Sequence, residues 1–87
     1  MNIYQYNLPL PKSQHFLKRY IKFISFYHKL ALQKSQETYT ENHHILPRCM
    51  GGPDELYNLV RLPAQAHFIA HWMLWKAYGK VMSSAFI

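Results

Sequence analysis

The sequence contains a single cysteine, Cys49, and this scarcity limits how the chain can be held together. One thiol can form neither an internal disulfide nor a cysteine-rich zinc site. The chain also lacks the apolar run of about 18 residues that a membrane-spanning helix needs, and its N-terminus lacks the pattern of a signal peptide. We therefore expect an intracellular protein with no membrane segment.

Acidic residues are also scarce, and their scarcity leaves the chain strongly basic. Four Asp and Glu stand against ten Lys and Arg, so the net charge is +6 and the pI is about 9.6. Residues 1–40 hold six of the basic residues and one acid, Glu37, a balance of +5. Such an excess favours a polyanionic partner such as nucleic acid. The 87 residues suffice for one small domain, and domains of this size often depend on a metal or a partner.

Apolar residues recur at helical spacing from about residue 13 to residue 34, and this pattern predicts an amphipathic helix. Ser13 suits the N-cap position of that helix. Residues 1–12, which include two prolines, are expected to form an extended arm before it. The predicted buried stripe consists of Phe16, Tyr20, Phe23, Ile24, Tyr27, Leu30 and Ala31.

Three lysines, Lys18, Lys22 and Lys29, project from the face opposite that stripe when the helix is drawn at 100° per residue. This face is either the solvated side of an ordinary helix or a surface that contacts phosphates. No acidic residue lies between Lys12 and Lys34, which favours phosphate contacts.

Downstream of the helix the sequence predicts two short strands separated by a loop. Residues 37–45 favour extended backbone because they include Thr38, Tyr39 and Thr40. Residues 46–57 hold two prolines, two glycines and an aspartate, which is typical of a loop. The following apolar run, Leu59-Val60-Arg61-Leu62, suits a second strand.

A second helix is expected from Pro63 to Tyr78, because proline is well tolerated at a first helical position and Gly79 suits the C-terminal end. Its predicted apolar stripe consists of Ala64, Phe68, Trp72 and Trp75. We therefore divide the chain into an arm with a basic helix (1–36), a unit of two strands, loop and helix (37–79), and the start of a truncated C-terminal segment (80–87).

Four of the six histidines lie within residues 43–71. His67 and His71 are four residues apart on the predicted second helix, so their rings project from one face and suit a shared metal ion. His43 and His44 are adjacent in an extended segment, so their side chains point to opposite sides. One of these two can therefore join the helical pair at a metal while the other faces a substrate.

The order His43-His44, then Asn58, then His67 and His71, resembles the motif of the HNH endonuclease family, whose members carry a ββα-metal finger. The resemblance runs from about Glu41 to Tyr78 and is similar to small phage-encoded and homing-type members. It implies an α+β fold in which a short two-stranded hairpin with a long loop is followed by a helix. It also implies that the protein is located in the cytoplasm of a bacterial or phage-infected cell. The residues that carry it are Glu41-Asn42-His43-His44-Ile45-Leu46-Pro47-Arg48, Gly51-Gly52, Asn58-Leu59-Val60-Arg61-Leu62 and Ala66-His67-Phe68-Ile69-Ala70-His71.

The resemblance also implies roles for individual residues. His43, His67 and His71 match metal-ligand positions, and His44 matches the general base that deprotonates water. Asn58 matches a position that ligates the metal in some relatives, and in others holds the loop and orients the base. The implied reaction is hydrolysis of phosphodiester bonds in duplex DNA, which leaves 5′-phosphate and 3′-hydroxyl ends. Histidine suits the base because it titrates near neutral pH.

A site of three imidazoles suits Zn²⁺, Ni²⁺ or Mn²⁺ better than Mg²⁺, which prefers oxygen ligands. Mg²⁺ stays an alternative if Asn58 and water complete its coordination. One metal and one base predict that a single chain nicks DNA, so a double-strand break needs a homodimer or two successive nicks. Arg48 and Arg61 are expected either to contact phosphates or to be solvated, and Glu41 to orient a histidine.

Two other interpretations stay open. The first is a DNA-binding module without catalysis, in which a structural zinc ion takes His44 as its fourth ligand beside His43, His67 and His71. The second is a helical interaction module whose histidines are incidental, but it leaves the spacing of the motif unexplained.

Overall fold

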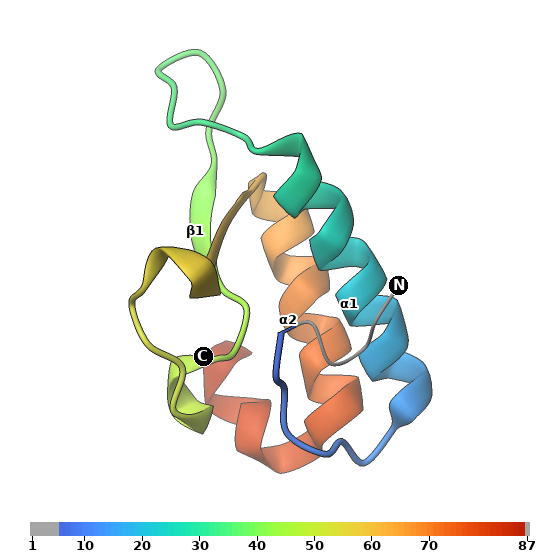
Figure 1. Cartoon of the computed structure of the whole chain (residues 1–87). Coiled ribbons are helices and arrows are strands. Elements are labelled where there is room, and N and C mark those ends of the chain that lie inside the picture. The colour runs from blue at the N-terminus through green and yellow to red at the C-terminus, as the bar shows by residue number, and fades with distance from the viewer. Residues whose placement is uncertain (1–5, 87) are drawn as a thin grey trace.

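Two long helices, α1 and α2, lie side by side, and a two-stranded hairpin packs along one flank of the pair (Figure 1). This computed structural model describes residues 6–86, with side chains up to Met82. The elements in chain order are α1 (Gln14–Leu30), β1 (Glu41–His44), η1 (Arg48–Met50), η2 (Leu56–Asn58), β2 (Leu59–Leu62), α2 (Ala64–Tyr78) and η3 (Gly79–Phe86). The predicted α+β class, with a small ββα unit after a first helix, is confirmed.

Helix α1 begins as predicted and ends earlier than predicted. The Ser13 hydroxyl caps it by accepting a hydrogen bond from the Phe16 N–H at 3.3 Å. At the other end Ala31 takes a left-handed conformation with φ of 51°, and its N–H bonds to the Tyr27 carbonyl. This cap ends the helix at Leu30 rather than near residue 34.

The buried face of α1 is rotated from the predicted stripe. Leu17, Tyr20, Ile21 and Ile24 are buried, whereas Leu30 is exposed. The aromatic rings predicted for the stripe, apart from Tyr20, are only half-buried and cover the edge of the core. Three aliphatic residues and Tyr20 therefore form the hydrophobic part of the buried face of α1, and the other aromatic rings lie beside it.

The hairpin pairs β1 with β2 in antiparallel register, with His43 opposite Val60 and His44 opposite Leu59. Strand β1 covers only Glu41–His44, because residues 35–39 form bends and irregular backbone instead of the predicted extension from residue 37. The predicted loop joins the strands and contains the short turns η1 and η2. Gly52 is required there, since a Cβ at this position would lie 1.7 Å from the Leu46 carbonyl oxygen.

Helix α2 starts after Pro63 and ends at Gly79, whose φ of 75° suits glycine. Its predicted apolar stripe is wrong: Phe68 is 63% exposed, Trp72 39% and Trp75 40%. The face that packs into the core contains three alanines, which allow close approach of α1 and the hairpin. That face consists of Ala66, Ala70, Met73, Leu74, Ala77 and Tyr78.

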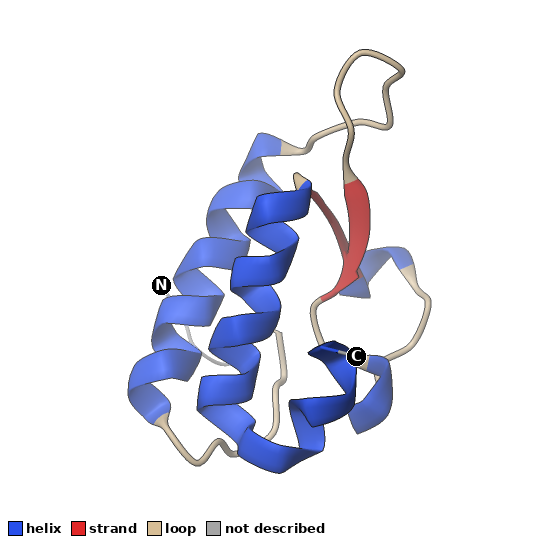
Figure 2. Ribbon diagram, turned by 180° about the vertical axis from the view of Figure 1, so that it is seen from behind, coloured by secondary structure: helices blue, strands red, loops and turns tan. Residues whose placement is uncertain are grey.

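Figure 2 shows these elements from behind. One hydrophobic core joins them. It contains Tyr20 and Ile24 of α1, Leu62 of β2 and Leu74 of α2. Residues 80–87, expected to open a further segment, continue from α2 as η3 as far as Phe86, and Met82 lies in the core. None of the helices in residues 6–86 is long and apolar enough to cross a membrane.

Candidate metal and catalytic site

Three histidines converge where β1 meets α2. His43 comes from β1, and His67 and His71 come from one face of α2, as their spacing predicted. One nitrogen of each ring lies within 4.8 Å of the others, and the Nε2 atoms of His67 and His71 are 3.0 Å apart. His43 is 1% exposed, while the other two are half-buried. The geometry suits a single ion bound by three imidazoles.

Tyr20 of α1 forms a hydrogen bond with His43 and helps to hold its ring in place. Its hydroxyl lies 2.7 Å from His43 Nε2 and donates to the Ile45 carbonyl oxygen at 2.7 Å. Complete burial raises the pKa of Tyr20 well above its ordinary value, so the group stays a phenol. Burial, with the charges of His67 and His71, lowers the pKa of His43 and keeps its ring neutral. The neutral ring is the form that binds a metal.

Glu41 holds His67 in a similar way. Its Oε1 atom lies 2.8 Å from His67 Nδ1, and its Oε2 atom accepts a hydrogen bond from the Tyr39 hydroxyl at 2.6 Å. The hydrogen bonds from Tyr39 and His67 lower the pKa of Glu41, so the group is a carboxylate. A carboxylate only accepts, so His67 donates from Nδ1 and its Nε2 lone pair faces the cluster.

The residues fit a divalent cation. Within residues 6–86, the buried Nδ1 atom of His43 has no hydrogen-bond partner, and a buried nitrogen left in this state is costly. An ion between the three rings would satisfy it. Burial, together with the charge of His67, lowers the pKa of His71, which also keeps that ring neutral. Three neutral nitrogen donors match the preference of Zn²⁺ and related ions.

His44 points away from His43, as expected for neighbours on a strand, and lines an open cavity of about 660 Å³. His67 and His71 line the same cavity. The His44 Nε2 atom lies 2.5 Å from Asp54 Oδ1, and the hydrogen bonds of His44 and Arg48 lower the pKa of that carboxyl. Other lining residues are Asn42, Pro47, Arg48, Cys49 and Leu59.

The contact with Asp54 fixes the tautomer of His44. Asp54 is a carboxylate and only accepts, so His44 donates from Nε2 and carries its lone pair on Nδ1. Arg48 Nε lies 3.1 Å from the same carboxylate oxygen and 3.3 Å from His44 Nε2, but a nitrogen that donates to Asp54 cannot also accept from Arg48. A neutral His44 is therefore ready to accept a proton at Nδ1.

Asn58 fastens the loop that carries Asp54. Its Oδ1 atom accepts from the Leu46 N–H at 2.8 Å, and its Nδ2 atom donates to the carbonyls of Leu46 at 3.0 Å and Pro53 at 2.9 Å. Both amide hydrogens are therefore used on loop backbone. These bonds correspond to the loop-holding role among those implied for Asn58, and its part in catalysis stays a prediction.

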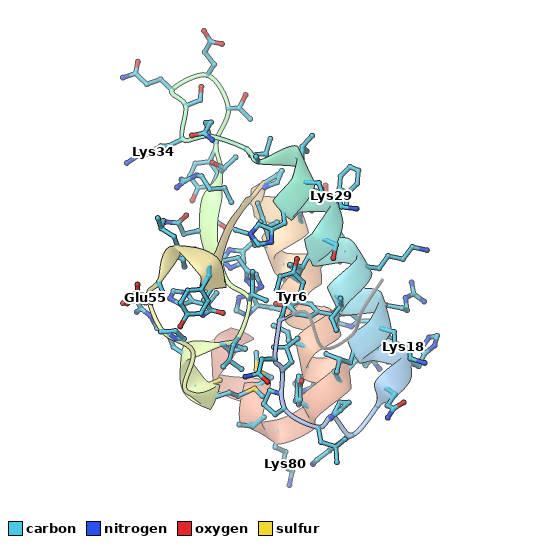
Figure 3. All side chains as sticks on the ribbon, in the orientation of Figure 1. Tyr6, Lys18, Lys29, Lys34, Glu55 and Lys80 are labelled. Atoms are coloured by element: carbon cyan, nitrogen blue, oxygen red, sulfur yellow. The ribbon has the colours of Figure 1, made fainter. Side chains whose placement is uncertain are left out.

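The five basic residues predicted to contact DNA lie in different surroundings. Lys18, Lys22 and Lys29 are exposed on α1, and Figure 3 shows Lys18 and Lys29 on the side away from the hairpin. Arg48 lies at the cavity. Arg61 is not brought into the cavity: its guanidinium donates to the Thr40 hydroxyl and carbonyl and to Asn42. Arg61 therefore ties β2 to β1.

Sequence reasoning missed Tyr20 and Asp54 as members of the site. The pattern placed Tyr20 on the buried stripe of α1 but did not indicate which residue it would meet. Asp54 follows Gly51-Gly52-Pro53 in a loop, where an aspartate is common for conformational reasons alone. The one available signal was that a histidine ring facing a substrate usually donates a hydrogen bond from its second nitrogen to an acceptor of the protein.

Together the fold and the site define a small domain of ββα type with a candidate three-histidine metal centre beside a His–Asp pair. No family model and no solved structure matches the chain. The proteins to which it is similar include several of Enterobacteria phage T4 that are named as probable mobile endonucleases. Endonuclease E is 62% identical over 40 residues, 46% of this chain and 28% of that protein. Endonuclease D is 60% identical over 40 residues, 46% of this chain and 15% of that protein. Endonuclease C is 54% identical over 46 residues, 53% of this chain and 22% of that protein. The similarity thus covers about half of this chain and less than a third of each relative.

Proposed function

We propose that this chain is a metal-dependent nuclease module of the HNH type, which hydrolyses phosphodiester bonds in duplex DNA. The observation that carries the proposal is the position of His44, which is bonded to Asp54 and lines one cavity with His67 and His71. The names of the phage relatives, probable mobile endonucleases, support the same reaction class.

His43, His67 and His71 would hold one divalent ion, with Zn²⁺, Ni²⁺ or Mn²⁺ favoured by the three nitrogen donors and Mg²⁺ as the alternative. Such an ion, when bound, supplies positive charge that stabilises the developing charge on the phosphate and on the leaving oxygen. Glu41 and Tyr20 hold two of the rings in position from outside the cluster.

His44 acts as the general base in this proposal. Its Nδ1 atom accepts a proton from water, and the water oxygen forms a bond to phosphorus while the bond from phosphorus to the 3′ oxygen breaks. The imidazolium that forms is stabilised by the Asp54 carboxylate. The 3′ oxygen leaves as a hydroxyl after taking a proton from solvent, and the other end keeps a 5′-phosphate.

Arg48 is the basic side chain suited to bind the phosphate at the cavity, because its exposed guanidinium already lies there. Lys18, Lys22 and Lys29 would contact phosphates farther along the DNA. Arg61 would contribute indirectly by stabilising the hairpin, since three of its nitrogens donate hydrogen bonds to Thr40 and Asn42. A single chain nicks one strand, and two copies would be needed for a concerted double-strand break.

The alternative is a DNA-binding module with a structural zinc ion and no catalysis. It requires His44 as a fourth ligand. His44 instead lies outside the group of three clustered histidines and bonds to Asp54, so the geometry favours catalysis.

Plasmid nicking tests the proposal. Wild-type protein should convert supercoiled plasmid to open circles, EDTA should stop the reaction, and single metals added back should identify the ion. His15→Ala is a matched control, because His15 is exposed on α1. Nicking that persists unchanged in EDTA, or in a His44→Ala variant, would contradict the proposal.

A further inference from the structure

We infer that Tyr20 is a positioning residue of the proposed metal centre, which fixes the tautomer of His43 and so selects Nδ1 as its metal-binding atom. The inference rests on the proposed metal site. It assigns a role there to α1, a helix outside the ββα unit.

The hydrogen-bond chemistry of one phenol carries the argument. The Tyr20 oxygen lies 2.7 Å from the Ile45 carbonyl oxygen and 2.7 Å from His43 Nε2. A carbonyl can only accept, so the single phenolic hydrogen goes to Ile45. In the bond with His43, the Tyr20 oxygen therefore has to accept, and His43 donates from Nε2.

This hydrogen bond determines the state of Nδ1, the other nitrogen of the His43 ring. A neutral imidazole with hydrogen on Nε2 carries its lone pair on Nδ1. His43 Nδ1 is buried, and among the described residues no group bonds to it. The centroid of the His43 ring lies 5.1 Å from that of His67 and 5.3 Å from that of His71. With the other tautomer, a hydrogen on Nδ1 would stand where a metal ligand is needed.

Tyr20→Phe tests this role, because it keeps the ring in the core and removes only the hydroxyl. Tyr78→Phe is a matched control: Tyr78 is also a buried tyrosine that donates to a backbone carbonyl, that of Pro9 at 2.8 Å. Both variants lose one bond from a phenol to a backbone carbonyl, and Tyr20→Phe also loses the bond with His43 Nε2. An effect on the metal site that occurs only in Tyr20→Phe therefore comes from the bond with His43.

Two measurements separate the variants. Nitrogen NMR of metal-free wild type should show His43 as the single tautomer with hydrogen on Nε2, and Tyr20→Phe should show a mixture. Zn²⁺ affinity should fall by about 10- to 100-fold in Tyr20→Phe and stay near wild type in Tyr78→Phe. Hydrogen on Nδ1 in metal-free wild type, or equal Zn²⁺ affinity in both variants, would overturn the inference.

The wild-type NMR spectrum keeps the inference testable even if Tyr20→Phe does not fold. It needs neither metal nor DNA, so it is also independent of the nuclease proposal. Hydrogen on Nε2 in a protein that never nicks DNA would support the role of Tyr20 and contradict only the proposed reaction.

A different observation carries a second inference, which concerns the outer surface of the two helices. Helices α1 and α2 contain five Lys and Arg residues and no acid, because all four acids lie within residues 37–55. A groove of about 730 Å³ between the helices is lined by Arg19, Lys22, Phe23, Phe26, Ile69, Trp72 and Met73.

Aromatic rings are exposed among these cations. Phe26 is 61% exposed and the two tryptophans, Trp72 and Trp75, 39% and 40%. The Lys76 ammonium lies 5.8 Å from the centre of the Trp72 ring and 5.5 Å from that of Trp75. We propose that this basic aromatic surface binds single-stranded DNA, with unpaired bases on the rings and phosphates on the cations. Duplex DNA fits less well because its base faces are already stacked.

Both tryptophans of the chain lie on α2, next to this surface, so their fluorescence reports on it directly. Metal-free His44→Ala protein, in which the proposed cleavage should be suppressed, should show quenching by a thymidine homopolymer at low salt and weaker quenching at high salt. Arg19→Gln should reduce the affinity, whereas Lys34→Gln should not, because Lys34 lies beyond the end of α1.

Three outcomes would overturn this second inference. They are absence of quenching at low salt, equal quenching by a duplex of the same length, and fluorescence that changes only with protein concentration. The last outcome would mark the surface as a contact between copies. Nicking is not measured, so failure here leaves the proposed nuclease reaction untouched.

Discussion

The Asp54 carboxylate accepts a hydrogen bond from His44 Nε2 at 2.5 Å, although the two residues are ten positions apart in the chain. The bond connects an exposed loop residue with the imidazole at the cavity, and it decides which nitrogen of His44 can accept a proton. In the proposed reaction it would also stabilise the charged ring after proton transfer. His44 and Asp54 thus form the base of the proposed reaction together.

Asp54→Asn should slow nicking while leaving metal binding near wild type. The amide keeps the size of the side chain but loses the charge that stabilises the imidazolium, and it can also turn its N–H towards His44. The loss should be smaller than that of His44→Ala, since the imidazole is still present. Glu55→Gln is the control, because Glu55 is an exposed acid next in the chain. Equal rates for the two variants would remove Asp54 from the mechanism.

Asn58→Ala should destabilise the protein without removing the metal. The variant loses three part-buried hydrogen bonds to loop backbone, and a fully buried group left unsatisfied costs about 1–3 kcal/mol. Thermal melting should therefore fall, and nicking should fall because the loop no longer holds Asp54. Metal titration is the deciding measurement: a loss of affinity as large as that of His67→Ala would mean that Asn58 is a ligand.

DNA binding should depend steeply on salt and weakly on sequence. The motivation is the charge distribution, with Lys18, Lys22 and Lys29 exposed on an acid-free helix. Replacing a lysine that binds a phosphate with Gln should reduce the slope of log affinity against log salt by about 0.9. Lys34→Gln serves as the control. An unchanged slope after replacement of Lys18, Lys22 and Lys29 together would assign these lysines to the solvated face.

The metal-free protein should lose stability as the pH falls below about 6.5, the ordinary pKa of histidine. His43 has a lowered pKa in the folded protein, caused by burial and by His67, His71 and His44. The unfolded chain therefore binds protons first, and the free energy of unfolding falls from pH 6.5 down to the folded pKa. Denaturant titrations across this range test the sign. A free energy that rises as the pH falls would contradict it.

Local sequence signals predicted the parts of the fold that depend on local chemistry. Ser13, Pro63 and Gly79 mark helix ends because capping and backbone preferences act within a few residues. The spacing of His67 and His71 determines a shared face on any helix. The structure also places Glu41 against His67, the contact expected for a histidine-orienting carboxylate.

Features that depend on tertiary packing could not be predicted in this way. Helix α2 is apolar almost all round, so its sequence does not define a buried face, and the choice of Ala70 over Trp72 depends on how closely α1 approaches. Likewise Tyr20 meets His43 across 23 residues, and nothing within α1 indicates that partner.

The central claim is that one histidine is the base and three others hold the metal. It is tested most directly by metal titration and plasmid nicking on the same preparations of His44→Ala and His67→Ala. His67→Ala should lose metal affinity, thermal stability and nicking together. His44→Ala should keep metal affinity and melting temperature near wild type while nicking falls by about 10²–10⁴-fold. If His44→Ala lost the metal as completely as His67→Ala, His44 would be a ligand and the site a structural zinc centre.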